Sequence, residues 1–209
     1  MSADFTGMLV VAAFFCLLIL VFIWWRFGLA DTLAFVIVVG LFSATMDFIS
    51  SFVARNYEYP GRSPSWVFTY VFFGWMGMCG SCLFIAEGIL ARRREDMLSQ
   101  PGLWWSVPLL TAVIAVVFDL FIDPVAVKAG YWVWLKPGSV YYNIPLLNYV
   151  GWFVLMLLAP LAWILLATRQ HWSLSRKLTG AFIALLPLFI ASVTLSLALN
   201  AVITALGLQ

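Results

Sequence analysis

The chain has few charged residues. Asp, Glu, Lys and Arg make up only 10% of its 209 residues, whereas they make up about 25% of an ordinary soluble domain. Apolar residues account for 65% of the chain, and the mean hydropathy is +1.05. These values exclude a soluble globular domain and predict an integral membrane protein. The formal net charge of +2 is also too small to indicate a nucleic-acid partner.

Histidine and cysteine are scarce as well. The only histidine, His171, cannot build the histidine-rich centre of a di-iron membrane desaturase or hydroxylase, so we exclude that class and predict no bound metal. The cysteines Cys16, Cys79 and Cys82 all lie in apolar runs, which argues against a disulfide framework. The last two match the C-x-x-C spacing, but Gly77 and Gly80 beside them favour helix packing over redox or metal chemistry. No glycine-rich phosphate loop is visible, and we predict no cofactor.

Six long apolar runs are separated by charged or Pro/Gly-rich segments. They cover residues 5–25, 31–53, 65–90, 104–124, 145–168 and 179–206. Each is long enough for the roughly 20 residues that a spanning helix needs. We therefore predict an all-α, polytopic membrane bundle of about six transmembrane helices, forming one domain over residues 1–209. The first run is expected to be a span, because it is too long for a cleavable signal and lacks a basic start.

Positive charges are more frequent in one set of loops than in the other. The loops after the first, third and fifth runs hold seven, at Arg26, Arg92, Arg93, Arg94, Arg169, Arg176 and Lys177. The loops after the second and fourth runs hold four, at Arg55, Arg62, Lys128 and Lys136. The positive-inside rule then places the first set in the cytoplasm and both chain termini outside. Glu87, at the cytoplasmic end of the third run beside Arg92–Arg94, is expected to form an ion pair.

Three aspartates lie inside the predicted spans, at Asp47, Asp119 and Asp123. A carboxyl group in the bilayer core is costly, so such a residue is functional by default. Asp119 and Asp123 are four residues apart and share one helix face. Two carboxylates this close cannot both ionise cheaply in a poorly solvated site, so the pair is expected to keep a proton. Pro124 is expected to end or kink the helix at Asp123.

Each of these acids also has a structural explanation. The pair could be neutralised by Lys128 or Arg55, or could accept a hydrogen bond from a tyrosine. Asp47 lies in the hydroxyl-rich segment 43–51 and could serve as an interhelical contact. All three acids fall in the same half of the membrane, and we favour a single acid cluster that contacts a substrate.

Polar and aromatic residues converge on the end of the bundle where the acids lie. Aromatic rings in such a place can stabilise a cation by about 0.5–2 kcal/mol each. We therefore expect a ring-lined cavity beside the acids. The candidate substrate-binding residues are Asn56, Tyr57, Tyr59, Tyr131, Trp132, Trp134, Tyr141, Tyr142, Asn143, Asn148 and Trp152.

Several of these residues belong to ordered segments that resemble a known family. The segments are Asp119-Leu120-Phe121-Ile122-Asp123-Pro124, Gly130-Tyr131-Trp132-Val133-Trp134, Tyr141-Tyr142-Asn143-Ile144-Pro145 and Asn148-Tyr149-Val150-Gly151-Trp152. Their order resembles the central signature of the carotenoid biosynthesis membrane-protein family, which includes carotenoid 1′,2′-hydratases. A looser similarity relates Asp47 and the Tyr57-x-Tyr59 element to the family's upstream acid, usually Glu, and its Tyr-x-Tyr element.

The resemblance implies cofactor-independent hydration of a terminal isoprenoid double bond in a carotenoid or other long isoprenoid lipid, in a prokaryotic plasma membrane. The residues suggest acid catalysis: Asp119 or Asp123 protonates the alkene, and a second carboxylate such as Asp47 holds the water. A non-catalytic carotenoid- or lipid-binding accessory subunit of a larger complex is the alternative. A proton-coupled transporter ranks last, because no inverted repeat is visible. Membrane lipids are expected partners, and association with other subunits or copies of the chain stays open.

Overall fold

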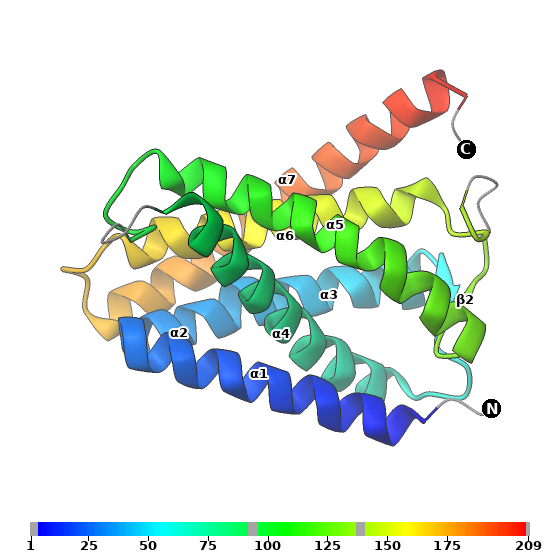
Figure 1. The fold of residues 1–209 in the computed structure, drawn as a ribbon, viewed down its shortest axis with the longest axis horizontal. Helices are drawn as coiled ribbons and strands as arrows, with labels where there is room; N and C mark the ends of the chain where they lie inside the picture. Colours follow the sequence, from blue (N-terminus) through cyan, green and yellow to red (C-terminus); the bar gives the residue numbers. More distant parts are fainter. Residues whose placement is uncertain (1–3, 92–95, 137–140, 208–209) are drawn as a thin grey trace.

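The fold is a bundle of apolar helices. The computed structural model describes residues 4–91, 96–136 and 141–207, and in them six helices are long and apolar enough to cross a membrane (Figure 1). They are α1 (Phe5–Phe27), the composite span Leu29–Val53, α4 (Pro64–Leu90), α5 (Leu103–Ala129), α6 (Leu146–Ala167) and α7 (Leu174–Ala205). The predicted all-α polytopic bundle is confirmed. Helices suit a bilayer, because a helix satisfies its own backbone hydrogen-bonding groups where water is absent.

Both chain termini lie at the same end of the bundle, at the right of Figure 1. This follows from an even number of spans. The predicted orientation, with the termini outside, rests in part on Arg92–Arg94, and these residues lie outside the described part of the chain. The orientation stays a prediction.

The second span is irregular and forms the centre of the bundle. It consists of α2 (Leu29–Phe35), η1 (Val36–Leu41), α3 (Phe42–Phe48) and η2 (Ile49–Val53), of which η1 and η2 are π-helical. It contacts α1, α4, α6 and α7, and most of its residues are buried. A π-helical turn is wider than an α-helical turn and changes the direction in which side chains point, and such turns often occur at functional sites. Here they flank α3, which carries Asp47.

The small residues of α4 let α1 approach closely. A Cβ atom on Gly80 would overlap the Ile19 side chain, and one on Gly77 would lie 3.3 Å from the Cys16 backbone nitrogen. The prediction that these glycines serve helix packing is confirmed. Cys79, between these two glycines in sequence, is a buried free thiol within the core.

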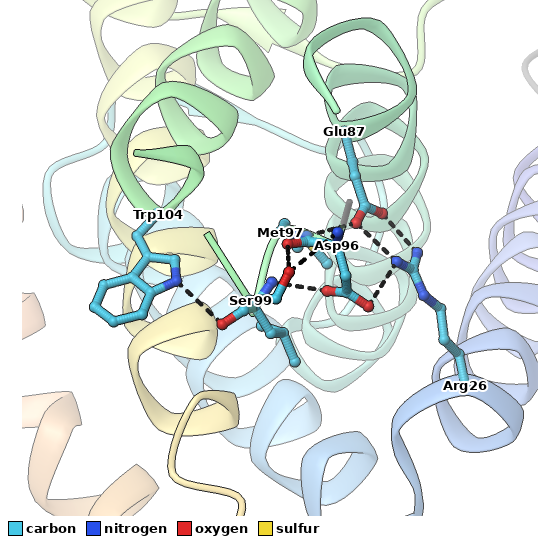
Figure 2. A network of polar contacts seen from close by, with 7 residues as sticks. Arg26, Glu87, Asp96, Met97, Ser99 and Trp104 are labelled. Atoms are coloured by element: carbon cyan, nitrogen blue, oxygen red, sulfur yellow. Dashed lines mark hydrogen bonds and ion pairs between the residues drawn. The ribbon is translucent and has the colours of Figure 1, made fainter. Parts of the chain in front are cut away.

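A polar network ties α1 to α4 at the end of the bundle away from the chain termini (Figure 2). Arg26 donates two hydrogen bonds to Glu87, at 2.6 and 2.8 Å, and a third to Asp96 at 3.1 Å. The backbone N–H of Met97 also donates to Glu87, at 3.0 Å. Glu87 is therefore in an ion pair, as expected, with Arg26 as its cation.

A second ion pair at the same end is deeply buried. The Lys177 ammonium group at the start of α7 donates to the Asp31 carboxylate at the start of α2, and the two side chains are only 4% and 8% exposed. The indole of Trp163 donates to the Asp31 carbonyl oxygen at 2.8 Å. This ion pair thus connects α2, near the start of the chain, to α7, near its end, inside the bundle.

Pro124 does not end its helix, and that part of the prediction is wrong. The α5 helix continues to Ala129 and ends where Gly130 adopts a left-handed conformation, with φ of 79°. A proline lacks the N–H that would bond the carbonyl four residues earlier, here that of Leu120. The hydroxyl of Tyr141 donates to this carbonyl at 3.0 Å. A residue distant in sequence therefore replaces the hydrogen bond that the proline removes.

The connections after the second and fourth spans meet in a small antiparallel ribbon. Its strands are β1 (Tyr57–Glu58) and β2 (Val133–Trp134), with Tyr57 opposite Trp134. The Leu135 N–H extends the pairing with a 2.9 Å hydrogen bond to the Asn56 carbonyl. The ribbon places residues from both connections beside the ends of the spans that carry the aspartates.

Replacing Lys177 by Met should destabilise the protein strongly. The substitution leaves the Asp31 carboxylate buried without its cation, which costs about 3–5 kcal/mol for a buried pair. Thermal unfolding in detergent should show a lower midpoint for Lys177→Met, and a smaller loss when Asp31→Leu is added. Lys128→Met, at an exposed position on α5, is the control. An unchanged midpoint in Lys177→Met would contradict the assignment.

Replacing Tyr141 by Phe should also destabilise the protein, because the Leu120 carbonyl then has no donor. A buried polar group left without a partner costs about 1–3 kcal/mol. Tyr142→Phe is the matched control, since that side chain is 69% exposed. Equal unfolding free energies for the two variants, measured in the same micelles, would show that the Tyr141 hydroxyl does not compensate for Pro124.

Candidate functional site

A cavity of about 1210 Å³ lies within the bundle beneath the β1–β2 ribbon. Residues of the ribbon and of all six spans line it. Its deeper wall is apolar and reaches the middle of α1 and α4, at Phe15 and Met78. Its polar lining residues include Asp47, Asn56, Tyr57, Tyr59, Tyr70, Asp123, Lys136 and Asn148. The cavity therefore joins a polar end to a long apolar compartment.

The α5 acids form one half of the polar end. Asp119 and Asp123 lie on the inner face of α5 and are 0% and 2% exposed. The side-chain amide of Asn148, on α6, donates to both of them, at 2.6 Å to Asp119 and 3.1 Å to Asp123. The indole of Trp132 donates to the other oxygen of Asp123 at 2.5 Å. The two acids thus share a neutral amide, as their spacing on one helix face allows.

No cation pairs with these acids among the described residues. The ion pairs found there involve Glu87, Asp96 and Asp31, all at the opposite end of the bundle. The structural alternative, in which Lys128 or Arg55 neutralises the pair, is therefore wrong. The acids depend on neutral donors for their solvation.

Asp47 forms the other half of the polar end. The indole of Trp75, on α4, donates to its carboxylate at 3.2 Å, and the Trp75 ring packs on Trp152 with centroids 4.6 Å apart. The phenols of Tyr57 and Tyr59 lie close to the same carboxyl group. Burial, and then the nearby Asp47 charge, raise the pKa of both tyrosines well above its ordinary value. Both phenols therefore keep their protons and can act as donors.

Aromatic rings on the ribbon connect the two halves. The Tyr57 ring packs on Trp134 at 4.9 Å, and the Tyr59 ring packs on Trp132 at 6.1 Å. Trp132, whose indole donates to Asp123, therefore contacts the ring of Tyr59, whose phenol lies near Asp47. The ribbon thereby builds a single site from acids on two different spans.

Four buried polar atoms in the described residues have no hydrogen-bond partner. They are Asp47 Oδ1, Asp119 Oδ1, Trp134 Nε1 and the Tyr149 hydroxyl. Each belongs to the acid cluster or lies near it: Trp134 is close to Asp123, and both α5 acids act on Tyr149. An unpaired buried group costs about 1–3 kcal/mol. Their concentration at one place is typical of a site that binds water or polar groups.

The structure brings most of the predicted site residues to one cavity. Those lining it are Asp47, Asn56, Tyr57, Tyr59, Asp123, Tyr131, Trp132, Trp134, Asn148 and Trp152. Asp119 lies outside the lining and is linked to it through Asn148. Tyr141 supports the α5 backbone, whereas Tyr142 and Asn143 are exposed, with left-handed φ values of 47° and 60°. Those last three residues are not part of the cavity wall.

Sequence reasoning missed several residues of the site. Trp75 had a usable signal, because it lies inside a span, whereas membrane tryptophans usually gather at the interfaces. The polar residues of α7 that line the cavity also had a sequence signal. Ser192, Ser196 and Asn200 recur every four residues and so share a helix face. Tyr149 had a signal as well, because it lies in the Asn148–Trp152 segment that resembles the family signature.

The arrangement suits proton transfer to an apolar molecule. Carboxyl groups solvated by neutral donors can carry or lose a proton more readily than carboxylates locked to a cation. No group of three or more His, Cys, Asp or Glu side chains placed to hold a metal ion occurs within residues 4–91, 96–136 and 141–207. The chemistry visible at the site is that of the acids, amide and rings themselves.

Comparison with known proteins identifies a family. A family model described as carotenoid biosynthesis protein matches residues 5–208. No curated protein and no solved structure matches the chain.

The extent of chemical labelling should differ between the acids that line the cavity and the acid that does not. Dicyclohexylcarbodiimide, which reaches protonated carboxyl groups from an apolar phase, should modify Asp123 and Asp47 far more than Asp119, which lies outside the cavity lining. Asp31, paired with Lys177, is the internal control and should stay unmodified. Peptide mass spectrometry locates the adducts, and equal labelling of Asp119 and Asp123 would contradict this geometry.

Proposed function

Because the chain belongs to the carotenoid biosynthesis protein family, we propose that it is a hydratase that adds water to a terminal isoprenoid double bond of a carotenoid. One observation carries the proposal: an acid cluster that forms no ion pair among the described residues lies at the polar end of a large apolar cavity. The membrane bundle and the family together support a role in carotenoid biosynthesis. The choice of hydration follows from the resemblance to the family's hydratases, and the acid cluster suggests how the reaction could proceed.

The cavity is suited to one end of a long polyene. Its volume of about 1210 Å³ is above the roughly 300–1,000 Å³ of most small-molecule sites. Gly74 and Gly151 widen it, since a Cβ atom on either would meet no other atom within 4 Å. The apolar chain would lie against residues such as Phe15 and Met78, and its terminal double bond would meet the acids.

Asp123 is the proton donor in this mechanism, because it lines the cavity and Asp119 does not. Its carboxylic proton moves to the less substituted alkene carbon, where the π electrons form the new C–H bond. The other alkene carbon becomes a tertiary cation. The Asp123 carboxylate and the rings of Trp132 and Trp134 stabilise this cation where its charge develops.

Asp47 is the base in the second step. A water molecule forms a C–O bond to the cation with an oxygen lone pair, and it gives one proton to the Asp47 carboxylate. The product is a tertiary alcohol, heavier than the substrate by one water. The cluster returns to its starting state when a proton leaves Asp47 and another returns to Asp123. Asp47 Oδ1, which has no hydrogen-bond partner in the described part of the chain, can accept the water proton.

Replacing Asp123 by Asn should abolish hydration while the protein still folds. General acid catalysis contributes about 10²–10⁴-fold, so product should fall by at least that lower factor. The test is expression in a host that makes lycopene or γ-carotene, with pigments analysed by liquid chromatography–mass spectrometry. Asp96→Asn, at the opposite end of the bundle, is the control.

Two results would refute this function. Full activity of Asp123→Asn would remove the proposed proton donor. Purification of the wild-type chain with unmodified pigment, and no turnover of any linear carotenoid supplied, would favour a pigment-binding accessory subunit instead.

A further inference from the structure

A second, smaller cavity lies on the other side of the β1 connection. Its volume is about 410 Å³. It is lined by Ser51, Phe52, Arg55, Glu58, Tyr59, Pro60, Gly61, Arg62 and Leu135. The three charged residues are all exposed, so this outer pocket is open to water. The large cavity beneath it is apolar over most of its length.

Tyr59 is the one described residue that lines both cavities. Its side chain is 8% exposed and is held among the rings of Tyr57, Tyr70 and Trp132, at centroid distances of 5.8, 6.2 and 6.1 Å. Pro60 follows it and restricts its backbone to extended conformations. The ring is therefore a fixed partition between the outer pocket and the acid cluster.

The outer pocket also comes within one helical turn of Asp47. Ser51, in its lining, donates a hydrogen bond to the Asp47 carbonyl oxygen at 3.0 Å. On the inner side, the Tyr59 phenol lies near the Asp47 carboxyl group, and burial beside that group keeps the phenol protonated. A phenol can donate one hydrogen bond and accept another, so it can connect water on one side with a carboxylate on the other.

We propose that water and protons reach Asp47 from the outer pocket past Tyr59, which acts as a positioning residue and partition; this role rests on the proposed hydration. Hydration consumes one water in each turnover, and the apolar compartment is a poor route for it. The phenol hydroxyl passes a proton between Asp47 and the outer water, while the ring keeps bulk water from the cation.

The first test measures access and does not depend on catalysis. A Met46→Cys variant places a thiol in the inner cavity, one residue before Asp47. A cationic, membrane-impermeant methanethiosulfonate reagent should label this thiol several-fold faster when Tyr59→Ala is added. Tyr57→Ala is the matched control, because Tyr57 lines only the inner cavity. The parent chain, with its three buried cysteines, gives the background rate.

An unchanged labelling rate in Tyr59→Ala, or equal acceleration in Tyr57→Ala, would overturn the partition. Acceleration confined to Tyr59→Ala, in a protein that hydrates no carotenoid, would support the passage and refute the proposed function. The two ideas can therefore fail separately.

The second test uses Tyr59→Phe, which keeps the ring and removes only the hydroxyl. In liposomes, kcat should fall by about 10²-fold, the lower end of what a proton-transfer group contributes, while KM for the carotenoid stays unchanged. The solvent deuterium isotope effect should rise, since proton return becomes slower. The isotope effect should not change in Tyr142→Phe, because Tyr142 is exposed and lines neither cavity. An isotope effect and kcat in Tyr59→Phe equal to those of the parent chain would overturn the proton path.

Discussion

The hydrogen bonds that Asn148 donates to Asp119 and Asp123 are the interaction on which the site depends. Two carboxyl groups on one helix face inside a bilayer need hydrogen-bond donors, because a buried polar group without a partner is costly. One neutral amide serves both and joins α5 to α6. Trp132 adds a donor from the ribbon and so fixes the ribbon over the same acids. The position of the cavity follows from these contacts.

The two ends of the bundle satisfy their buried acids in opposite ways. Away from the chain termini, Glu87 and Asp31 are held in ion pairs by Arg26 and Lys177. At the cavity end, Asp47 and Asp123 are held by indole, amide and phenol donors, which carry no net charge. The first arrangement joins helices. The second leaves the acids able to exchange protons, which is what acid catalysis needs.

Much of the fold was predictable because its signals are local. The six helices match the six apolar runs, mostly to within a few residues at each end, and the spacing of Asp119 and Asp123 predicted their shared face. The end of α5 was not predictable. Pro124 would break an isolated helix. In the protein, α5 continues through it, and the hydroxyl of Tyr141, from a later segment, donates to the Leu120 carbonyl that the proline leaves without its N–H donor.

The sequence alone determined the membrane bundle, the depth of its acids and the aromatic character of one end, since hydropathy and helical period act over short stretches of chain. Tertiary structure decided which groups meet. Trp75 reaches Asp47, and the β1–β2 pairing brings Tyr57 and Tyr59 against Trp134 and Trp132, only because separate spans pack together. Tyr59 separates two cavities for the same reason, because each cavity is formed only when residues from separate segments come together.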